Sequence, residues 1–113
     1  IEKIYKIRDN VIKNINRIIS KNQNIVGYGS PAKATTALNF FGISKQIDFV
    51  IEDNVLKHGK FIPGVNIEIK SKKKIDKKID NLLVLAWNFF DDIKKNNSKL
   101  TKNILNIKDL ENN

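Results

Sequence analysis

Apolar side chains recur every three or four positions along the first twenty residues of the chain. They are Ile1, Ile4, Ile7, Val11, Ile12, Ile15, Ile18 and Ile19, with Lys, Arg, Asp and Asn between them. Spacing of this kind places the apolar side chains on one face of an α-helix and leaves the polar ones on the other. The pattern therefore predicts an amphipathic helix over residues 1–20.

A short apolar run and a glycine turn come next. Residues 24–28 predict a strand, and the segment Gly27-Tyr28-Gly29-Ser30-Pro31-Ala32-Lys33 predicts a tight turn into a helix. Ser30 is suited to cap that helix, because its hydroxyl can accept from an unpaired backbone N–H. Pro31 is suited to the first helical position, where no backbone donor is needed.

The remaining pattern predicts strands alternating with helices. In chain order we expect a helix over 31–41 closed by Gly42, a strand over 47–51, a loop over 55–64, a short strand over 65–69, a lysine-rich helix from Ser71 to Ile79, a buried strand over 82–87, a helix over 89–96, and an edge strand or helical turn over 102–107. This alternation predicts an α/β fold with right-handed crossovers. We expect one Rossmann-like domain over residues 1–113, a three-layer sandwich with a long N-terminal helix and a mainly parallel sheet of about four to five strands.

The amino-acid composition excludes several kinds of site from this chain. The chain has no cysteine and one histidine, His58, which excludes disulfides, thiolate metal sites and a histidine metal cluster within it. No apolar run approaches the ~20 residues that a membrane span needs, and we expect a cytoplasmic protein. The chain starts at Ile1 and has no methionine, so we expect a fragment or a processed piece of a longer protein.

The net charge of +9 raises the question of nucleic-acid binding. Only Arg8 and Arg17 are arginines, and the lysines are dispersed apart from one cluster between residues 70 and 78. Ile, Lys and Asn are used heavily throughout, which indicates compositional bias more than a designed patch. Charge alone is not a binding site, so we do not expect a nucleic-acid partner.

The glycine turn is the first candidate site. The spacing Gly27-x-Gly29-x-x-Ala32 fits the dinucleotide-binding fingerprint, which presents backbone N–H groups at a helix N-terminus to an anion. Lys33 would add a positive charge there. The alternative is a purely structural strand-to-helix connection in which Lys33 is a solvated helix residue.

Other candidates follow the predicted strands, whose carboxyl ends should meet at one edge of the sheet. Asp53 lies about 20 residues beyond the turn, where a ribose-binding acid is found in dinucleotide-binding domains; its alternative role is to end the strand. Trp87 is either a ligand platform or, as is more common, a core residue. We favour Asn88 as a helix N-cap over a substrate contact, and His58 as a loop residue over a catalytic base.

Several blocks in fixed order resemble the C-terminal domain of the SAM-dependent sugar C-methyltransferase family. They are Gly27 to Lys33, Leu38-Asn39-Phe40 with Gly42-Ile43, Ile47 to Val50, Asp53-Asn54 with Lys57 and Gly59-Lys60, Pro63-Gly64, and Leu83 to Asn88. The resemblance covers about residues 1–108. Ser30, Ala34, Val55 and His58 depart from the usual residues of that family.

The resemblance implies a protein of three parts. A zinc-binding segment and a central domain that binds S-adenosylmethionine would precede this piece, and the central domain would hold the catalytic groups. There a base would deprotonate the carbon beside a keto group, and the enolate would attack the methyl group of S-adenosylmethionine.

This piece would then be an accessory domain that closes over a nucleotide-linked keto-deoxysugar, with no catalytic residue, metal or cofactor of its own. Its substrate-binding residues would be Gly29, Ser30, Pro31, Ala32, Lys33, Asp53, Asn54, Lys57, Trp87 and Asn88. The alternative is a free-standing nucleotide-binding module of the NAD or CoA type.

Overall fold

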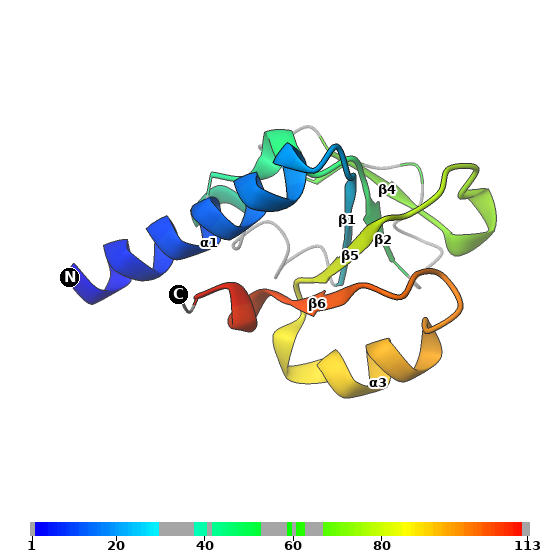
Figure 1. The fold of residues 1–113 in the computed structure, drawn as a ribbon. Coiled ribbons are helices and arrows are strands. Elements are labelled where there is room, and N and C mark those ends of the chain that lie inside the picture. Colours follow the sequence, from blue (N-terminus) through cyan, green and yellow to red (C-terminus); the bar gives the residue numbers. More distant parts are fainter. Residues whose placement is uncertain are drawn as a thin grey trace.

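The fold is a six-stranded sheet with helices and turns on both faces (Figure 1). The computed structural model describes residues 2–29, 38–40, 42–52, 59, 61–62 and 67–111. The strands are β1 (Ile25–Tyr28), β2 (Val50–Ile51), β3 (Phe61–Ile62), β4 (Ile67–Lys70), β5 (Asn81–Val84) and β6 (Ile104–Asn106). The helices are α1 (Glu2–Ser20) and α3 (Phe90–Asn96), residues 38–40 are also helical, and 3-10 turns lie at Ser44–Gln46, Lys72–Lys74, Trp87–Phe89 and Ile107–Glu111.

The strand order is β3-β4-β2-β1-β5-β6. All neighbours pair in parallel except β3, which pairs antiparallel with β4 at one edge. From β1 the chain builds outward through β2 to β4, and then crosses back to place β5 on the other side of β1. This is a Rossmann-like α/β fold with a mainly parallel sheet, and its strand order reverses between β1 and β5.

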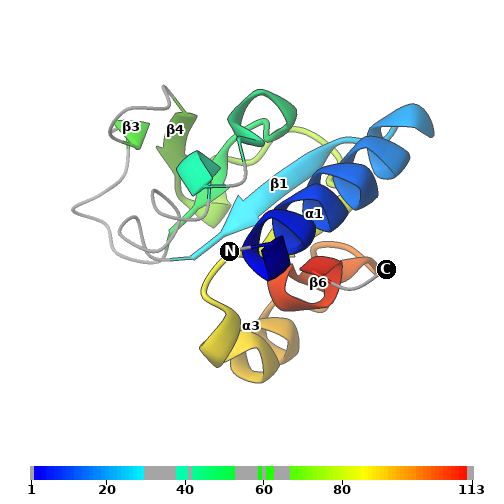
Figure 2. The same ribbon diagram turned by 90° about the vertical axis from the view of Figure 1, so that its left-hand side faces the viewer.

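Each face of the sheet has its own hydrophobic cluster. Alternate residues of β1 point to opposite faces, so Ile25 belongs to one cluster and Val26 to the other. The first cluster packs under α1, Ile43 and the C-terminal turn, whereas the second packs under α3 and the segment that leads into β5. Figure 2 shows the C-terminal turn after β6 lying beside α1.

The strongest periodic patterns are confirmed. Helix α1 and strand β1 lie where the pattern predicts them, and β5 is a fully buried parallel strand between β1 and β6. Gly42 has φ +65°, and its N–H donates to the carbonyl of Leu38 at 3.0 Å, as expected of a residue that ends a helix. The last uncertain segment forms an edge strand, β6, followed by a 3-10 turn.

The prediction of a lysine-rich helix from Ser71 to Ile79 is wrong. Only one 3-10 turn forms, Lys72–Lys74, and Ser71 caps it by accepting from the Lys73 N–H at 3.1 Å. A helix would place Lys73 one turn from Lys77, a like-charge pair that destabilises helices. The segment instead crosses the sheet in an extended path with Ile75 and Ile79 packed on the second cluster.

Two smaller predictions are also corrected. The loop predicted over 55–64 contains strand β3, whose Phe61 pairs with Glu68 of β4. The strand predicted over 47–51 is assigned only at Val50–Ile51. Its earlier residues still pair with β1, because the Asp48 N–H donates to the Ile25 carbonyl at 3.0 Å. The predicted caps Ser30 and Pro31 lie outside the described residues.

A network of hydrogen bonds joins the amino ends of β1 and β5. The Asn24 N–H donates to the Asp80 carboxylate at 2.9 Å, and the Asn24 side-chain oxygen accepts from the Asp80 N–H at 2.7 Å. The Asn24 amide also donates to the Lys78 carbonyl at 2.7 Å, and Asn81 donates to the Asn24 carbonyl at 3.0 Å. Asn24 thus holds together two segments far apart in the sequence.

Replacing Asn24 with alanine should lower the free energy of unfolding by about 1–3 kcal/mol. The reason is that the partly buried backbone N–H of Asp80 and the carbonyl of Lys78 lose their hydrogen-bond partner. Urea unfolding followed by circular dichroism measures this change. The exposed Asn16 is the matched control, and its alanine variant should change stability by less than about 0.5 kcal/mol. Equal effects at the two positions would refute the role given to Asn24.

Candidate functional site

The candidate site lies at the carboxyl ends of β1 and β5. Ligands of open α/β sheets bind beyond the carboxyl ends of the strands where the strand order reverses, and here that point falls between these two strands. The β1 and β5 ends are joined by a hydrogen bond from the Leu85 N–H to the Tyr28 carbonyl at 2.8 Å. The candidate site therefore has Gly29 on one side and the segment after β5 on the other.

Gly29 permits the two strand ends to approach this closely. Its φ is +150°, and its N–H donates to the Ile51 carbonyl at 3.3 Å. A Cβ atom at this position would lie 3.0 Å from the backbone nitrogen of Ala86. The second glycine of the fingerprint is thus required by packing between strands, whether or not a ligand binds beside it.

Trp87 lies shortly after β5 and begins a 3-10 turn. Its side chain is 46% exposed, so the interpretation of Trp87 as a core residue is wrong. The ammonium group of Lys108 lies 4.8 Å from the centre of the indole ring, and the same ammonium is 3.7 Å from a carboxylate oxygen of Glu111. An exposed indole with a cation against it offers a surface on which a planar or sugar ring can pack.

Asn88 does not have the capping role that the sequence favoured. It lies inside the 3-10 turn Trp87–Phe89, and the N-cap positions of that turn and of α3 are Ala86 and Phe89, neither with a side-chain cap. The apolar strand ends at Val84, earlier than predicted, so the helix begins through an intermediate 3-10 turn. Asn88 instead lines a shallow hollow of about 340 Å³ together with Trp87, Phe89, Phe90, Asp91, Asp92 and Asn106.

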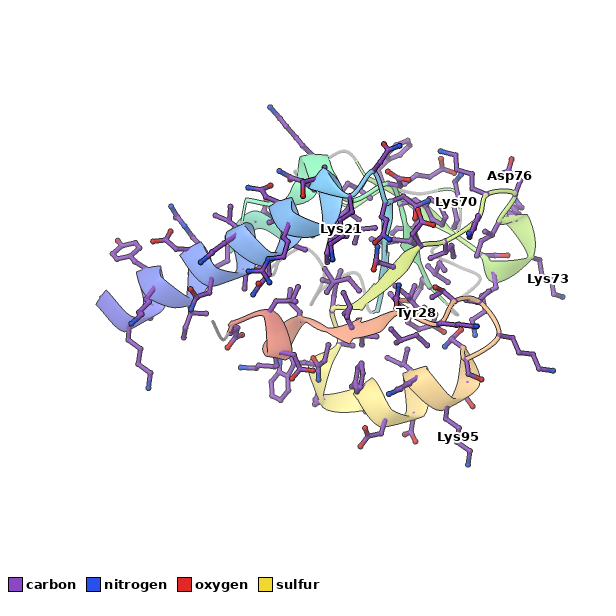
Figure 3. All side chains as sticks on the ribbon, in the orientation of Figure 1. Lys21, Tyr28, Lys70, Lys73, Asp76 and Lys95 are labelled. Carbon is purple, nitrogen blue, oxygen red and sulfur yellow. The ribbon has the colours of Figure 1, made fainter. Side chains whose placement is uncertain are left out.

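Two lysines of the cluster between residues 70 and 78, which the sequence analysis did not select as site residues, lie at the same edge of the sheet. The Lys70 ammonium is 4.7 Å from the centre of the Phe49 ring, and the Lys72 ammonium is 5.3 Å from the centre of the Tyr28 ring. Both are half-buried, whereas Lys73 and Lys95 point outward (Figure 3). The alternation Ile67-Glu68-Ile69-Lys70 indicates, from the sequence alone, that Lys70 lies on the sheet face opposite the two isoleucines.

Glu52 is an acidic residue that the sequence analysis did not select. It directly follows β2, is half-buried, and donates its backbone N–H to the Lys70 carbonyl at 3.1 Å. An acid at the end of the second strand is the position from which dinucleotide-binding domains hold a ribose. Its neighbour Asp53, which the sequence favoured for that role, lies outside the described residues.

The structure therefore brings together three of the predicted site residues, Gly29, Trp87 and Asn88, at one edge of the sheet. The others lie outside the described residues: Ser30, Pro31, Ala32, Lys33, Asp53, Asn54 and Lys57. Ligand binding by any of them stays a prediction.

Other parts of the described chain offer weaker alternatives. A hollow of about 480 Å³ lies at the opposite edge of the sheet, near the amino ends of β1 and β5, where ligands of such sheets do not normally bind. The described residues include no group of three or more acidic or histidine side chains that could hold a metal ion. No helix in the described ranges is both long and apolar enough to span a bilayer.

Comparison with known proteins shows where this architecture occurs. The family described as "C-methyltransferase C-terminal domain" matches residues 1–106. The chain is also 30% identical over 100 residues to the C-methyltransferase NovU of Streptomyces niveus. That match covers 87% of this chain and 24% of NovU, so the chain spans about a quarter of its relative.

Proposed function

The chain belongs to the family of C-methyltransferase C-terminal domains, and on that premise we propose that it is the substrate-binding accessory domain of a methyltransferase that uses S-adenosylmethionine. Membership of a C-terminal domain family implies a companion N-terminal domain. The companion would bind S-adenosylmethionine, which supplies the methyl group, and would hold the catalytic groups. The substrate is a nucleotide-linked keto-deoxysugar or a similar compound, and the enzyme is cytoplasmic.

The observation that carries the proposal is the edge between β1 and β5. Trp87 is exposed and directly follows Ala86, the residue that a Cβ atom at Gly29 would meet, at the point where the strand order reverses. In the proposed arrangement the backbone N–H groups of Ser30 and Ala32 hold the substrate phosphates. Lys33 and Lys57 contribute positive charge to the same phosphates.

The sugar side of the substrate would face the segment after β5. Trp87 supplies a ring surface, and Asn88 and Asn54 supply amide groups that can both donate and accept hydrogen bonds. Asp53, which directly precedes Asn54 in the sequence, would accept hydrogen bonds from sugar or ribose hydroxyl groups. Lys108 stabilises the exposed indole through the cation–π contact.

The substitution Lys33→Ala tests the phosphate role. In the full-length protein, isothermal titration with a nucleoside diphosphate at low salt should show about tenfold weaker binding, because a charge-assisted hydrogen bond is lost. Lys95→Ala is the matched control, since Lys95 is exposed on α3 and points outward. An affinity unchanged by Lys33→Ala would remove Lys33 from the phosphate site.

A second candidate is a free-standing nucleotide-binding module, and Glu52 at the end of β2 is the observation that favours it. Such a module must bind its nucleotide tightly without another domain. Titration of the 113-residue chain with NAD, CoA and S-adenosylmethionine distinguishes the two functions. Tight binding of one of these by the chain alone would favour the module, and binding only when the companion domain is present would favour the accessory domain.

A further inference from the structure

The first two turns of α1 carry apolar side chains that nothing in the described fold covers. The stripe that buries Val11 and Ile15 completely continues toward the N-terminus through Ile7, which is half-buried, to Ile4, which is 51% exposed. Tyr5 beside it is 56% exposed. The periodicity is unbroken, so the change from buried to exposed reflects where the rest of the domain ends.

The other described elements pack on α1 only from about its middle onward. The C-terminal turn is fastened there, because the Asn14 side chain donates to the Leu110 carbonyl at 2.9 Å and the Asn10 side chain donates to the Glu111 carbonyl at 3.1 Å. The turns before Asn10 extend past the sheet, and Figure 1 shows this end of α1 projecting from the body of the domain. Two large apolar side chains on a projecting helix end mark a surface for contact with another protein part.

The position of the surface in the chain identifies its occupant. A C-terminal domain follows its companion domain in the sequence, and α1 is the first element of the described residues. The match covers only 24% of NovU, so that relative has most of its chain outside the matched region. Of the described elements, α1 is therefore the one nearest to the companion domain along the chain.

We propose that Ile4 and Tyr5 dock into an apolar groove on the companion domain, and that α1 thereby sets the position of the β1–β5 edge relative to it. Lys3, Lys6 and Arg8 are exposed around the two apolar side chains, with the Arg8 guanidinium 5.9 Å from the centre of the Tyr5 ring. The groove therefore has an acidic rim. The proposal rests on the companion domain of the proposed function, and not on its substrate.

Amide hydrogen exchange of residues 6–9 measures this docking. These amides lie just inside the helix, where an uncovered end frays. We expect them to exchange at least about tenfold more slowly in the full-length protein than in the 113-residue chain, because docking must be broken before the end can open. Equal exchange in the two proteins would overturn the proposal.

The variant Ile4→Asp, made in the full-length protein, should abolish that protection. The helix should remain folded, because Ile4 is exposed and the buried residues Val11 and Ile15 are unchanged. Ile19→Asp is the matched control: Ile19 is 38% exposed on the same helix, fifteen residues away, and its substitution should leave the protection of residues 6–9 intact. Loss of protection in both variants would contradict a site at the N-terminal end.

Two further outcomes separate this proposal from others. Protection that rises with concentration in the 113-residue chain would show that a second copy occupies the surface, which overturns the proposal. Nucleoside diphosphate titration of the same full-length variants tests the proposed function independently. If residues 6–9 are unprotected but nucleotide binding depends on Lys33, only the docking proposal is refuted. If residues 6–9 are protected but nucleotide binding does not depend on Lys33, only the proposed phosphate site is refuted.

Discussion

Replacing Leu83 with alanine should lower the free energy of unfolding by about 2–5 kcal/mol. Leu83 is completely buried in β5, which has a parallel neighbour on each side, and belongs to the cluster under α1. Removing its side chain leaves a cavity that neighbours on both adjacent strands cannot fill. Denaturant unfolding followed by circular dichroism measures the change, and an unchanged slope would show that the unfolded state is unaffected.

Leu105 provides the matched control for this prediction. It lies beside Leu83 in register on the edge strand β6 and packs against the same cluster, but it is only partly buried. Its alanine variant should cost roughly half as much, since the edge position loses less buried surface. Equal losses at the two positions would mean that β6 is buried as deeply as β5, contrary to the structure.

The second large effect is expected at Gly29. An alanine there combines φ +150°, which L-residues rarely adopt, with a Cβ atom 3.0 Å from the backbone nitrogen of Ala86. Because that neighbour is backbone and cannot rotate away, the strand ends must separate. We expect Gly29→Ala to lower the free energy of unfolding by about 2–4 kcal/mol, the sum of backbone strain and overpacking.

Gly42 separates these two contributions. It also has a positive φ, +65°, but a Cβ atom there would meet nothing within 4 Å. Gly42→Ala should therefore cost only the conformational term, about 1 kcal/mol. Thermal unfolding of both variants compares them directly, and a Gly29 variant no less stable than the Gly42 variant would contradict the close approach of β1 and β5.

The elements predicted correctly from the sequence are those with long and consistent patterns. A stripe of isoleucines over nineteen residues admits only a helix, and Leu82-Leu83-Val84 admits only a buried segment. The segment from Ser71 to Ile79 has too few apolar positions for its pattern to decide, and like charges one turn apart oppose the helix. The pair Phe61–Ile62 is too short to show a period, and only its bonds to β4 make it a strand.

In the candidate site, too, some features could be predicted from the sequence and others could not. The glycine turn and the position of Trp87 after an apolar strand could be recognised locally, because each depends on neighbouring residues. The exposure of Trp87 and its contact with Lys108 could not, since the two residues are twenty-one positions apart and meet only when β6 closes the sheet. The contact of Lys72 with Tyr28 likewise depends on the crossover from β4.

The sequence by itself determined that this chain is an α/β domain with a glycine turn after its first strand, and its ordered blocks identified the family. These features depend on periodicity and on residues close together in the chain, which local sterics and burial of one face decide. Only the tertiary structure decided that Ile15 is buried while Ile4 on the same stripe is exposed. It also decided that Trp87 faces outward and that Gly29 touches β5. The physical reason is that burial and contact at these positions depend on where distant segments of the chain lie in the fold. A local pattern of residues carries no information about the positions of those segments.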